Sequence, residues 1–391
     1  MSPGVSPRRR AWLASVARLA GWPFALPLAA GAASTPAGDP VRRGRPMLFP
    51  RDHGAHLSAA IEWWYLTGHL VAAGNAPFGF QITFFRARTD LAATLDSRFA
   101  PRHLLFAHAA LTDLGAGRHL HQQRIARWSG DPAAALAHAA LHDTSLLVGG
   151  WTLQRGEVDR DGKVPPRSHY TTRFGSADSA TGQDFALDLQ VQARQPPLLQ
   201  GDAGFSRKGP DETQASHYIS EPQLEASGTL RRGGKALDVT GRAWLDHEWS
   251  DSLLHPQAVG WDWVGMNLDD GSALTAFQLR RADGSALWAG GTWRGADGLS
   301  TQFESEAVRF TPKRHWRSPG TGASYPLQWQ IDTPAGSFDV RALLDAQELD
   351  SRASTGTVYW EGLSELLDAQ QRRVGIGYLE MTGYAGRLRL G

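Results

Sequence analysis

The chain has 391 residues, enough for two domains or one large β domain, and its formal net charge of +1 argues against nucleic acid as a partner. It has no cysteine, which excludes disulfides, thiolate metal sites and a cysteine nucleophile. Its 15 tryptophans, against 4 methionines, indicate extensive aromatic packing or an aromatic ligand wall.

The amino terminus has the pattern of an export signal. Residues 1–10 are basic, an apolar stretch runs from Ala11 to Ala30, and small residues follow, so residues 1–33 are predicted to be a signal peptide. The Arg9-Arg10 pair resembles a twin-arginine signal, which exports folded proteins. An uncleaved signal segment would be the only membrane attachment, because no later stretch is apolar for long enough to span a bilayer. Residues 34–46 are expected to be a linker, and the mature protein is predicted to be periplasmic or secreted.

Short strands with alternating polarity are predicted from residue 47 onward. Phe49-Pro-Arg-Asp-His-Gly-Ala-His56 is the first dense motif, Glu62–Val71 is the first predicted strand, and Phe78–Arg86 is its hairpin partner. Further strands are expected at 104–113, 146–153, 170–174, 184–193 and 218–227, with a short alanine-rich helix at 133–140. The proline- and glycine-rich residues 195–218 are expected to cross the mouth of the first domain.

The central stretch, 241–265, alternates tryptophans with ionisable residues in a way that is unusual for a half-buried sheet. Strands are predicted at 237–244, 246–250 and 261–267, and residues of the same parity share a face. Trp244, Asp246 and Glu248 therefore take one side, and Leu245, His247 and Trp249 take the other. Trp261 and Trp263 likewise share a face, opposite Asp262. This pattern indicates a sheet whose concave side encloses a polar feature within an aromatic wall.

The second half of the chain, like the first, has the sequence pattern of many short strands. Strands are predicted at 273–281, 286–294, 303–312, 327–333, 338–344, 357–362 and 375–382, with a hairpin turn at 268–271. Many short strands with one weak helix indicate an antiparallel barrel or sandwich. Two β domains in tandem are expected, at 47–235 and 236–391.

Ionisable residues bracketed by aromatics permit several interpretations. They are His53, His56, Glu62, His69, His108, Asp246, His247, Glu248, Asp262, Glu361 and Glu380. A carboxyl group walled by tryptophan loses hydration, so its pKa rises and it can deliver a proton near neutral pH. Protonation of an alkene makes a carbocation, which tryptophan and tyrosine faces can stabilise, and a water activated by a second group completes a hydration.

Two other interpretations stay open. His53-x-x-His56 with Asp52, or Asp246-His247-Glu248, could supply nitrogen and oxygen ligands to a metal. The spacing matches no strong motif and adjacent strand residues point to opposite faces, so no metal site and no cofactor are predicted. The third interpretation is structural, because such polar pairs between strands often seal a core by hydrogen bonding.

Six motifs in order carry a family resemblance. They are Phe49-Pro-Arg-Asp-His-Gly, Glu62-Trp-Trp-Tyr-x-Thr-Gly68, Trp244-Leu-Asp-His-Glu-Trp249, Gly260-Trp-Asp-Trp263, Tyr359-Trp-Glu-Gly362 and Gly377-Tyr-Leu-Glu-x-Thr-Gly-Tyr384. Over residues 45–391 the chain resembles the two-domain lipocalin-like family of carotenoid 1,2-hydratases and AttH-type predicted secreted hydrolases. The resemblance implies an all-β fold of two tandem lipocalin-like antiparallel β-barrels.

The resemblance also implies an activity. The hydratases add water to a terminal double bond of an acyclic carotenoid without a cofactor, and the chain is similar to them at His247-x-Trp249. On a following strand the hydratases place a tyrosine and an acid, whereas this chain has Phe277, Gln278 and Arg280. AttH-type members are exported, and some are encoded near ABC transporters.

The combined prediction is an exported protein that binds a hydrophobic small molecule and performs cofactor-free hydratase or hydrolase chemistry. Asp246, Glu248 or Asp262 would be the acid, and His247 the water-orienting base. The predicted ligand-binding residues are His53, Glu62, Trp63, Trp64, Trp249, Trp261, Trp263 and Tyr384. The pocket would lie at the domain junction, lined by Trp63, Trp64, His247, Trp249 and Trp263. The alternative is a non-catalytic periplasmic lipid or isoprenoid carrier, or an accessory of an ABC transporter, in which these residues are structural.

Overall fold

Strands make up nearly all the regular structure of the protein. The computed structural model describes residues 41–89, 101–131, 134, 136–158, 167–178, 180–252 and 254–387. The predicted signal peptide, 1–33, lies outside these residues. Within them the only helices are three single 3₁₀ turns, at Arg51–His53 (η1), Ala73–Asn75 (η2) and Ser305–Ala307 (η3). The prediction of an all-β fold is confirmed.

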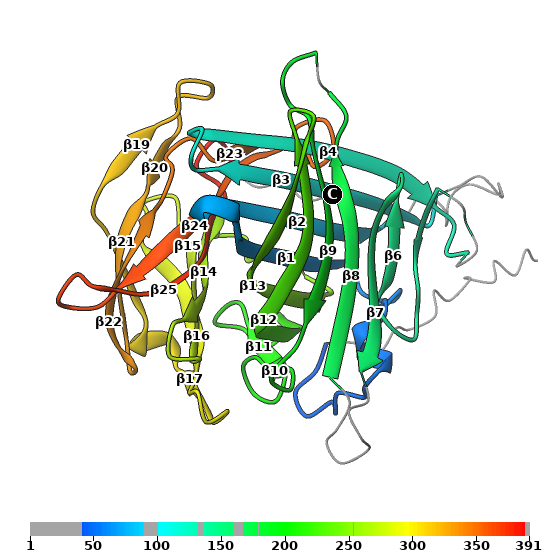
Figure 1. Cartoon of the computed structure of the whole chain (residues 1–391). Coiled ribbons are helices and arrows are strands. Elements are labelled where there is room, and N and C mark those ends of the chain that lie inside the picture. The colour runs from blue at the N-terminus through cyan, green and yellow to red at the C-terminus, as the bar shows by residue number, and fades with distance from the viewer. Residues whose placement is uncertain are drawn as a thin grey trace, which may run out of the picture. The chain divides into compact units, whose positions relative to one another are not determined.

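The first sheet has 13 antiparallel strands in the order β4-β3-β2-β1-β13-β12-β9-β8-β7-β6-β5, with β10 and β11 paired to β12 (Figure 1). Its strands are β1 (Ile61–Ala72), β2 (Ala76–Arg88), β3 (His103–Asp113), β4 (Arg118–Trp128), β5 (Ala137–Ala139), β6 (Ser145–Val148), β7 (Trp151–Val158), β8 (Arg167–Ser176), β9 (Phe185–Gln192), β10 (Leu198–Leu199), β11 (Phe205–Arg207), β12 (Ala215–Arg232) and β13 (Lys235–Ser250). The alanine-rich stretch was expected to form a helix, but its residues 137–139 form β5. Pairing with β6 overrides their helix propensity.

The second sheet has ten strands in the order β17-β16-β15-β14-β25-β24-β22-β21-β18, with β23 paired to β24. They are β14 (Gly260–Leu268), β15 (Ala273–Arg280), β16 (Ala286–Arg294), β17 (Ser300–Phe303), β18 (Arg309–Pro312), β21 (Gln328–Thr333), β22 (Gly336–Ala342), β23 (Glu348–Asp350), β24 (Val358–Leu367) and β25 (Arg373–Met381). A separate hairpin joins β19 (His315–Arg317) to β20 (Ser324–Pro326). Two successive antiparallel sheets agree with the predicted tandem architecture.

Strand β13 lies between β1 and β12 and so connects the early strands of the first sheet to its later ones. It was expected as two strands, 237–244 and 246–250, but it runs unbroken and pairs with both β1 and β12. The two sheets therefore divide between Ser250 and Gly260, later than the domain boundary expected at 235/236. The division into separately folding domains stays a prediction.

Strand β1 and residues 243–250 of β13 are buried on both faces, and this decides where polar groups collect. One face carries Trp64 and Leu245, which belong to the main core of the first sheet. The other carries Tyr65 and Trp244, which pack with Trp263 of the second sheet. A separate core lies within the second sheet and includes Val264, Met266 and Trp360. Neither face of the β1–β13 ladder is thus left to solvent.

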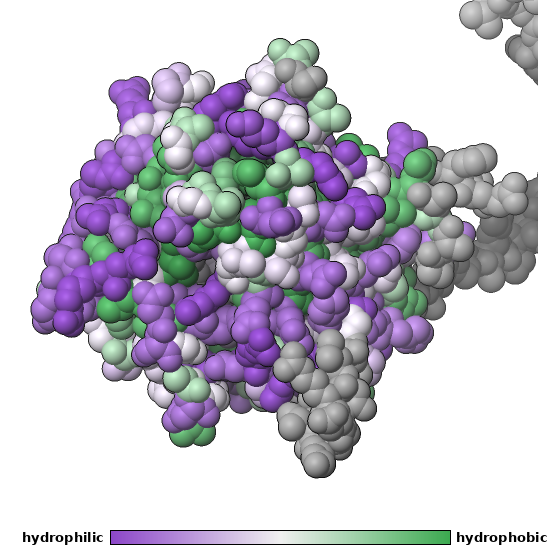
Figure 2. Space-filling view, viewed as in Figure 1, coloured by the Kyte–Doolittle hydropathy of each residue, from purple (hydrophilic) through white to green (hydrophobic). Residues whose placement is uncertain are grey.

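The described part of the predicted linker is anchored to the fold. The Val41 amide donates to Asp251 at 3.0 Å, and the Arg45 guanidinium forms two 2.9 Å hydrogen bonds to Asp52. The remainder, 34–40, lies outside the described residues. Among those described, no helix is long and apolar enough to cross a membrane. Figure 2 shows a mostly hydrophilic face, with hydrophobic residues between polar ones over the area where β3 and β24 lie in Figure 1.

Candidate functional site

The β1–β13 ladder sorts the ionisable residues onto two faces. In its register Glu62 lies opposite Trp249, Trp63 opposite Glu248, Trp64 opposite His247 and Tyr65 opposite Asp246. Because side chains alternate, Trp63, Tyr65, Asp246 and Glu248 share the face toward the second sheet. Glu62, Trp64, His247 and Trp249 share the face toward the interior of the first sheet. Each face carries its own cluster of buried carboxyl groups.

A cavity of about 130 Å³ lies on the face toward the second sheet, and we call it the junction pocket. Four carboxyl-bearing residues line it: Asp246, Glu248, Glu361 and Glu380. Its aromatic lining includes Trp63, Tyr65, Tyr218, Trp261, Trp263, Phe277 and Tyr359. Lys208 and His108 complete its ionisable lining. An apolar cavity with a few convergent polar groups is the usual form of a small-molecule site.

Asp246 is held by three hydrogen-bond donors on the first-sheet wall of the junction pocket. It accepts from Tyr218 Oη at 2.7 Å, Trp244 Nε1 at 2.7 Å and Ser220 Oγ at 2.5 Å. Burial raises the pKa of Asp246 to about 7, although these three donors oppose the rise. Tyr218 in turn accepts from Trp263 Nε1 at 3.0 Å, so the chain of hydrogen bonds reaches the second sheet.

Glu361 and Glu380 form the opposite wall. They are directly paired across β24 and β25, and Glu380 also lies opposite Trp263 on β14. Directly paired residues have Cβ atoms about 4.5–5.5 Å apart. Burial and the neighbouring Glu380 raise the pKa of Glu361 well above its usual range. Burial, with the charges of Asp246 and Glu248, raises the pKa of Glu380 to about 7. This pair therefore retains at least one proton at neutral pH.

Lys208 brings the junction pocket its cation. Its ammonium group lies 2.9 Å from Glu248 Oε1, and 4.6 Å and 4.4 Å from the ring centroids of Tyr218 and Phe277. Lys208 follows β11, in the segment 195–218 that was expected to cross the mouth of the first domain. It pairs with one of the four carboxyl groups, and within the described part of the chain no cation lies at hydrogen-bond distance from the other three.

The arrangement can perform acid–base chemistry. A carboxyl pair that retains a proton can protonate a bound molecule, and a carboxylate held by three donors on the facing wall can accept one. Aromatic side chains between the two walls can stabilise a cationic intermediate. The pocket therefore contains a complete acid–base set made of side chains alone.

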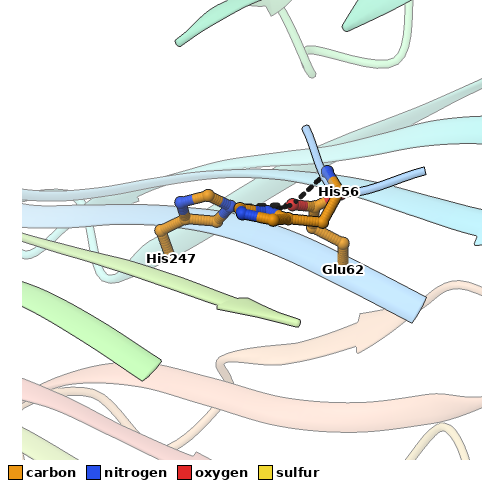
Figure 3. Close-up of side chains that lie close together, drawn as sticks. All are labelled: His56, Glu62 and His247. Carbon is orange, nitrogen blue, oxygen red and sulfur yellow. Dashed lines mark hydrogen bonds and ion pairs between the residues drawn. The ribbon is translucent and has the colours of Figure 1, made fainter. Parts of the chain in front are cut away.

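The opposite face of the ladder carries a different cluster. Glu62 accepts from the His56 amide at 3.0 and 3.1 Å and from His56 Nδ1 at 2.8 Å (Figure 3). It also accepts from Arg86 Nε at 2.8 Å. It also lies 3.0 Å from His247 Nε2. Burial by itself would raise the pKa of Glu62, but Arg86 and the two histidines outweigh it and hold the pKa well below its usual range. The carboxylate is therefore fully compensated.

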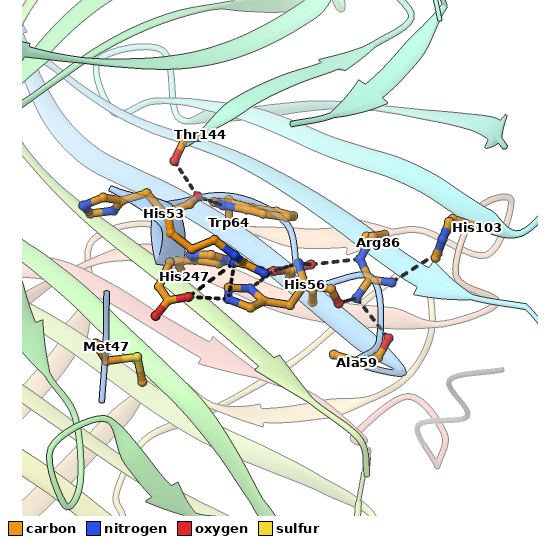
Figure 4. A network of polar contacts seen from close by, with 12 residues as sticks. Met47, His53, His56, Ala59, Trp64, Arg86, His103, Thr144 and His247 are labelled. Atoms are coloured by element: carbon orange, nitrogen blue, oxygen red, sulfur yellow. Dashed lines mark hydrogen bonds and ion pairs between the residues drawn. The ribbon is translucent and has the colours of Figure 1, made fainter. Parts of the chain in front are cut away.

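Further contacts make this cluster a continuous network (Figure 4). Arg86 also donates to the backbone carbonyls of His56 at 2.7 Å and Ala59 at 3.0 Å. His56 stacks on Trp249 with ring centroids 3.6 Å apart, and His247 stacks on Trp64 at 4.5 Å. The contacts of Glu62, His56 and Arg86 indicate a structural role, whereas Nδ1 of His247 is buried without a hydrogen-bond partner among the described residues.

A metal ion fits this cluster poorly. The potential ligand atoms of His56, Glu62 and His247 lie within 4.8 Å of one another, the closest such group among the described residues. Both Glu62 oxygens already accept hydrogen bonds, and the Arg86 guanidinium 2.8 Å away would repel a cation. In the first metal set considered from the sequence, Asp52 and His56 lie 3.1 Å apart, whereas the His53 ring lies 3.9 Å from Glu221. In the second set, His247 points away from Asp246 and Glu248.

Asp262 lies in a third environment, inside the second sheet. It accepts from Tyr384 Oη at 2.9 Å and Gln278 Nε2 at 2.8 Å, and it lies 2.8 Å from Arg280 Nε. Burial raises the pKa of Asp262, against the opposing charge of Arg280. Gln278 and Arg280, which lie on the strand where the resemblance implies a tyrosine and an acid, are thus partners of Asp262.

The structure divides the residues predicted for one pocket. Asp246, Glu248, Trp63, Trp261 and Trp263 line the junction pocket. His53, Glu62, Trp64, His247 and Trp249 lie on the opposite side of the β1–β13 ladder, and Asp262 and Tyr384 lie inside the second sheet. The predicted joint lining by Trp64, His247 and Trp249 is wrong, because strand alternation turns them away from Trp63 and Asp246.

Sequence reasoning missed several pocket residues. Glu361 and Glu380 were noted as ionisable residues between aromatics but were not selected, although both lie in motifs that carry the family resemblance. Lys208, Tyr218 and Tyr359 were not identified at all as site residues. No local pattern marks Lys208, whose role depends on contacts across the chain.

Comparison with known proteins gives a consistent result. The AttH-like family model matches residues 40–384. A crystal structure of a candidate AttH from Nitrosomonas europaea is 44% identical, covers 88% of this chain and 99% of its own, and has a TM-score of 0.78. Kievitone hydratase from Nectria haematococca is 15% identical, with coverage of 88% and 94% and a TM-score of 0.61, and shares the fold. No curated protein is significantly similar to the chain. These matches confirm the family resemblance predicted from the six motifs.

Proposed function

Because the chain belongs to the AttH-like family, we propose that it binds a hydrophobic small molecule in the junction pocket and processes it without a cofactor, by acid–base chemistry of the hydratase type. One observation carries the proposal. Carboxyl groups with raised pKa face one another across an apolar cavity, Asp246 on one wall and the Glu361–Glu380 pair on the other. Such opposed groups are typical of functional sites.

The roles follow from the two walls. The Glu361–Glu380 pair gives its proton to one carbon of a substrate double bond, and the electron pair of that bond forms the new C–H bond. The resulting carbocation is held against Trp63 and Trp263. Water then attacks the cation, and its surplus proton passes to Asp246. Return of this proton to the carboxyl pair through solvent restores the starting state, so the net change is the addition of one water.

The family's fold is compatible with this chemistry. Kievitone hydratase is a hydratase by its name, although at 15% identity its likeness extends to the fold alone. Hydrolysis of an acid-labile bond would use the same two walls, with the proton delivered to a leaving oxygen. The water-orienting role first given to His247 passes to Asp246 in this proposal, since His247 faces the opposite side of the ladder.

The proposal includes export to the periplasm or beyond, on the basis of the basic and apolar pattern of residues 1–33. The competing function is a non-catalytic carrier of lipids or isoprenoids, or an accessory of an ABC transporter. The apolar lining of the junction pocket suits a carrier equally well. The transporter partner rests on the family resemblance alone.

The test is incorporation of heavy water by purified protein. A lipid and isoprenoid extract of the native host is incubated in H₂¹⁸O with the wild type and with Asp246→Asn, Glu380→Gln and His247→Gln. The wild type should produce ¹⁸O-labelled products detectable by mass spectrometry. Asp246→Asn and Glu380→Gln should lower the rate by about 10²- to 10⁴-fold, the usual contribution of an acid or base.

His247→Gln is the matched control on the other face of the ladder, and it should retain activity within a few-fold. A ligand that all four proteins bind and release unchanged would support the carrier instead. Equal loss in His247→Gln and Asp246→Asn, with all variants folded, would contradict the assignment of roles to the two faces.

A further inference from the structure

A chain of hydrogen bonds crosses between the two sheets beside the junction pocket. His108 of β3 is buried, and its Nδ1 lies 2.7 Å from the hydroxyl of Tyr359 on β24. Its Nε2 lies 2.8 Å from Ser354 Oγ. Ser354 Oγ is 2.5 Å from Oε1 of Gln123 on β4. His108 and Tyr359 both line the pocket, whereas Ser354 and Gln123 stand behind them.

The direction of this chain is fixed at its far end. Gln123 Nε2 donates to the Asp350 carbonyl at 3.0 Å, which turns Gln123 Oε1 toward Ser354 as an acceptor. The other neighbour of Ser354 Oγ is the Ser351 carbonyl at 3.2 Å, also an acceptor. The Ser354 hydroxyl must therefore donate to one of these two oxygens and accept from His108 Nε2–H.

The tautomer of the His108 imidazole sets whether the Tyr359 hydroxyl donates or accepts. Burial lowers the pKa of His108 to about 3, so the ring is neutral and carries one N–H. With that proton on Nε2, Nδ1 is an acceptor, and the Tyr359 hydroxyl donates to it. The Tyr359 oxygen then has no proton to offer the pocket. It presents lone pairs only.

Tyr218, on another wall of the same pocket, has a similar arrangement with different partners. Its hydroxyl donates to Asp246 and accepts from Trp263 Nε1, which leaves one of its two lone pairs. Tyr359 has its donor used by His108 and has the Gln81 amide beside it, which lowers the pKa of the phenol against the larger effect of burial. A phenol oxygen has two lone pairs, so one acceptor position is left for a ligand.

We infer that Tyr359 is a directed hydrogen-bond acceptor that selects molecules bearing a hydroxyl group in the junction pocket, with His108 as its positioning residue. The inference rests on the proposed function and specifies it further. The hydroxyl belongs to the water that adds to the double bond and to the alcohol that results. The protonated carboxyl pair on the second-sheet wall donates hydrogen bonds, and Tyr359 is the matching acceptor. The ligand class that Tyr359 selects is therefore an apolar alcohol, the product of the proposed hydration.

The first test reads the tautomer of His108 and needs no ligand. Long-range ¹H–¹⁵N spectra distinguish the two neutral tautomers, and the His108 signal is assigned by its loss in His108→Gln. The Nε2–H form should be observed, unchanged between pH 5 and 8. The Nδ1–H form, in which His108 donates to Tyr359, would overturn the inference.

The second test measures selection with two probes of the same skeleton, all-trans-retinol and all-trans-retinal, followed by quenching of tryptophan fluorescence. The wild type should prefer the alcohol. Tyr359→Phe should weaken retinol binding by roughly 5- to 10-fold, the loss of one neutral hydrogen bond, and leave retinal within about 2-fold. In His108→Leu the freed Tyr359 hydroxyl can donate, so the preference should shift toward the aldehyde.

The matched control is Thr112→Val. Thr112 Oγ also joins the two sheets, by a 2.8 Å hydrogen bond to Gln347 Oε1, but neither residue lines the pocket. This variant should leave the alcohol-to-aldehyde ratio unchanged. If both probes bind and the alcohol-to-aldehyde ratio is the same in the wild type and in Tyr359→Phe, the inference is overturned but the proposed function is not. The variant Phe277→Trp fills the pocket and should weaken binding of both probes. Unchanged binding in this variant would refute the proposed site and the inference with it.

Discussion

The two faces of the β1–β13 ladder bury similar groups with opposite results. On one face Glu62 is fully buried and its pKa is held well below the usual range. On the other, Asp246 is only 3% exposed and its pKa rises to about 7. Burial raises the pKa of both carboxyl groups, and both accept several hydrogen bonds. Arg86 places a guanidinium beside Glu62, whereas the hydrogen-bond donors that the structure describes at Asp246 are all neutral.

The difference shows how one pair of strands can serve two purposes. A buried carboxylate that is paired with a cation stays ionised and ties elements together, as Glu62 joins the η1 segment, β1, β2 and β13. A buried carboxyl group whose partners are neutral donors exchanges its proton near neutral pH, as chemistry requires. Four substitutions test this comparison, and they follow in order of decreasing effect.

The largest effect is expected from Arg86→Met, which removes the cation from the Glu62 face. The unpaired buried carboxylate should lower the free energy of unfolding by about 3–5 kcal/mol, measured by urea denaturation. Addition of Glu62→Gln should recover most of this loss, because the double variant has no buried charge to compensate. A loss below about 1 kcal/mol in the single variant would contradict the assignment of Arg86 as the compensating charge.

The second effect is a pH dependence that originates from the Asp246 face. The pKa of Asp246 is 3.8 when unperturbed and about 7 in the folded protein, so the folded state binds more protons between these values. Its contribution to stability is therefore fully present below pH 4 and is lost as the pH rises to about 7, a fall of about 2–4 kcal/mol. Asp246→Asn should flatten this fall in urea titrations across the same window. An unchanged slope would mean that Asp246 titrates normally.

A smaller loss of stability is expected at the ion pair between Lys208 and Glu248 in the junction pocket. Lys208→Met leaves Glu248 unpaired and should cost about 1–2 kcal/mol in the same unfolding measurement. The control is Lys313→Met, which breaks a more exposed ion pair with Asp339 away from the pocket, and it should cost less than about 1 kcal/mol. Equal losses in the two variants would show that the pocket environment adds nothing to the Lys208 pair.

The smallest effect concerns Asp262, where an arginine and neutral donors act together. Tyr384→Phe removes one 2.9 Å hydrogen bond but leaves Arg280 and Gln278 in place. A cost of about 1 kcal/mol is expected, and thermal unfolding should detect it. A cost above about 3 kcal/mol would indicate that Arg280 does not compensate Asp262 by itself.

Much of the architecture could be predicted because it depends on local patterns. Alternation located most strands, including those that carry Trp63, Asp246 and Trp263. It failed at residues 137–139, where pairing with β6 decides the conformation, and at β13, where two expected strands are one. Register between β1 and β13 joins residues about 185 positions apart, as in the contact of His247 with Glu62, and no local pattern encodes such a pairing.

By itself, the amino-acid sequence determined the all-β class, the family, and the grouping of Asp246 with Glu248 against His247, because side-chain alternation follows from the geometry of an extended chain. Only the tertiary structure decided which group faces a cavity. Alternation separates inside from outside when one face of a strand meets water, but both faces of β1 and of residues 243–250 of β13 are buried. The sequence predicted that the strand carrying Arg86 pairs with the Glu62 strand, but it did not show that Arg86 contacts Glu62 or that Tyr218 contacts Asp246. Those contacts, which set the pKa of each carboxyl group, depend on the register and packing of the strands.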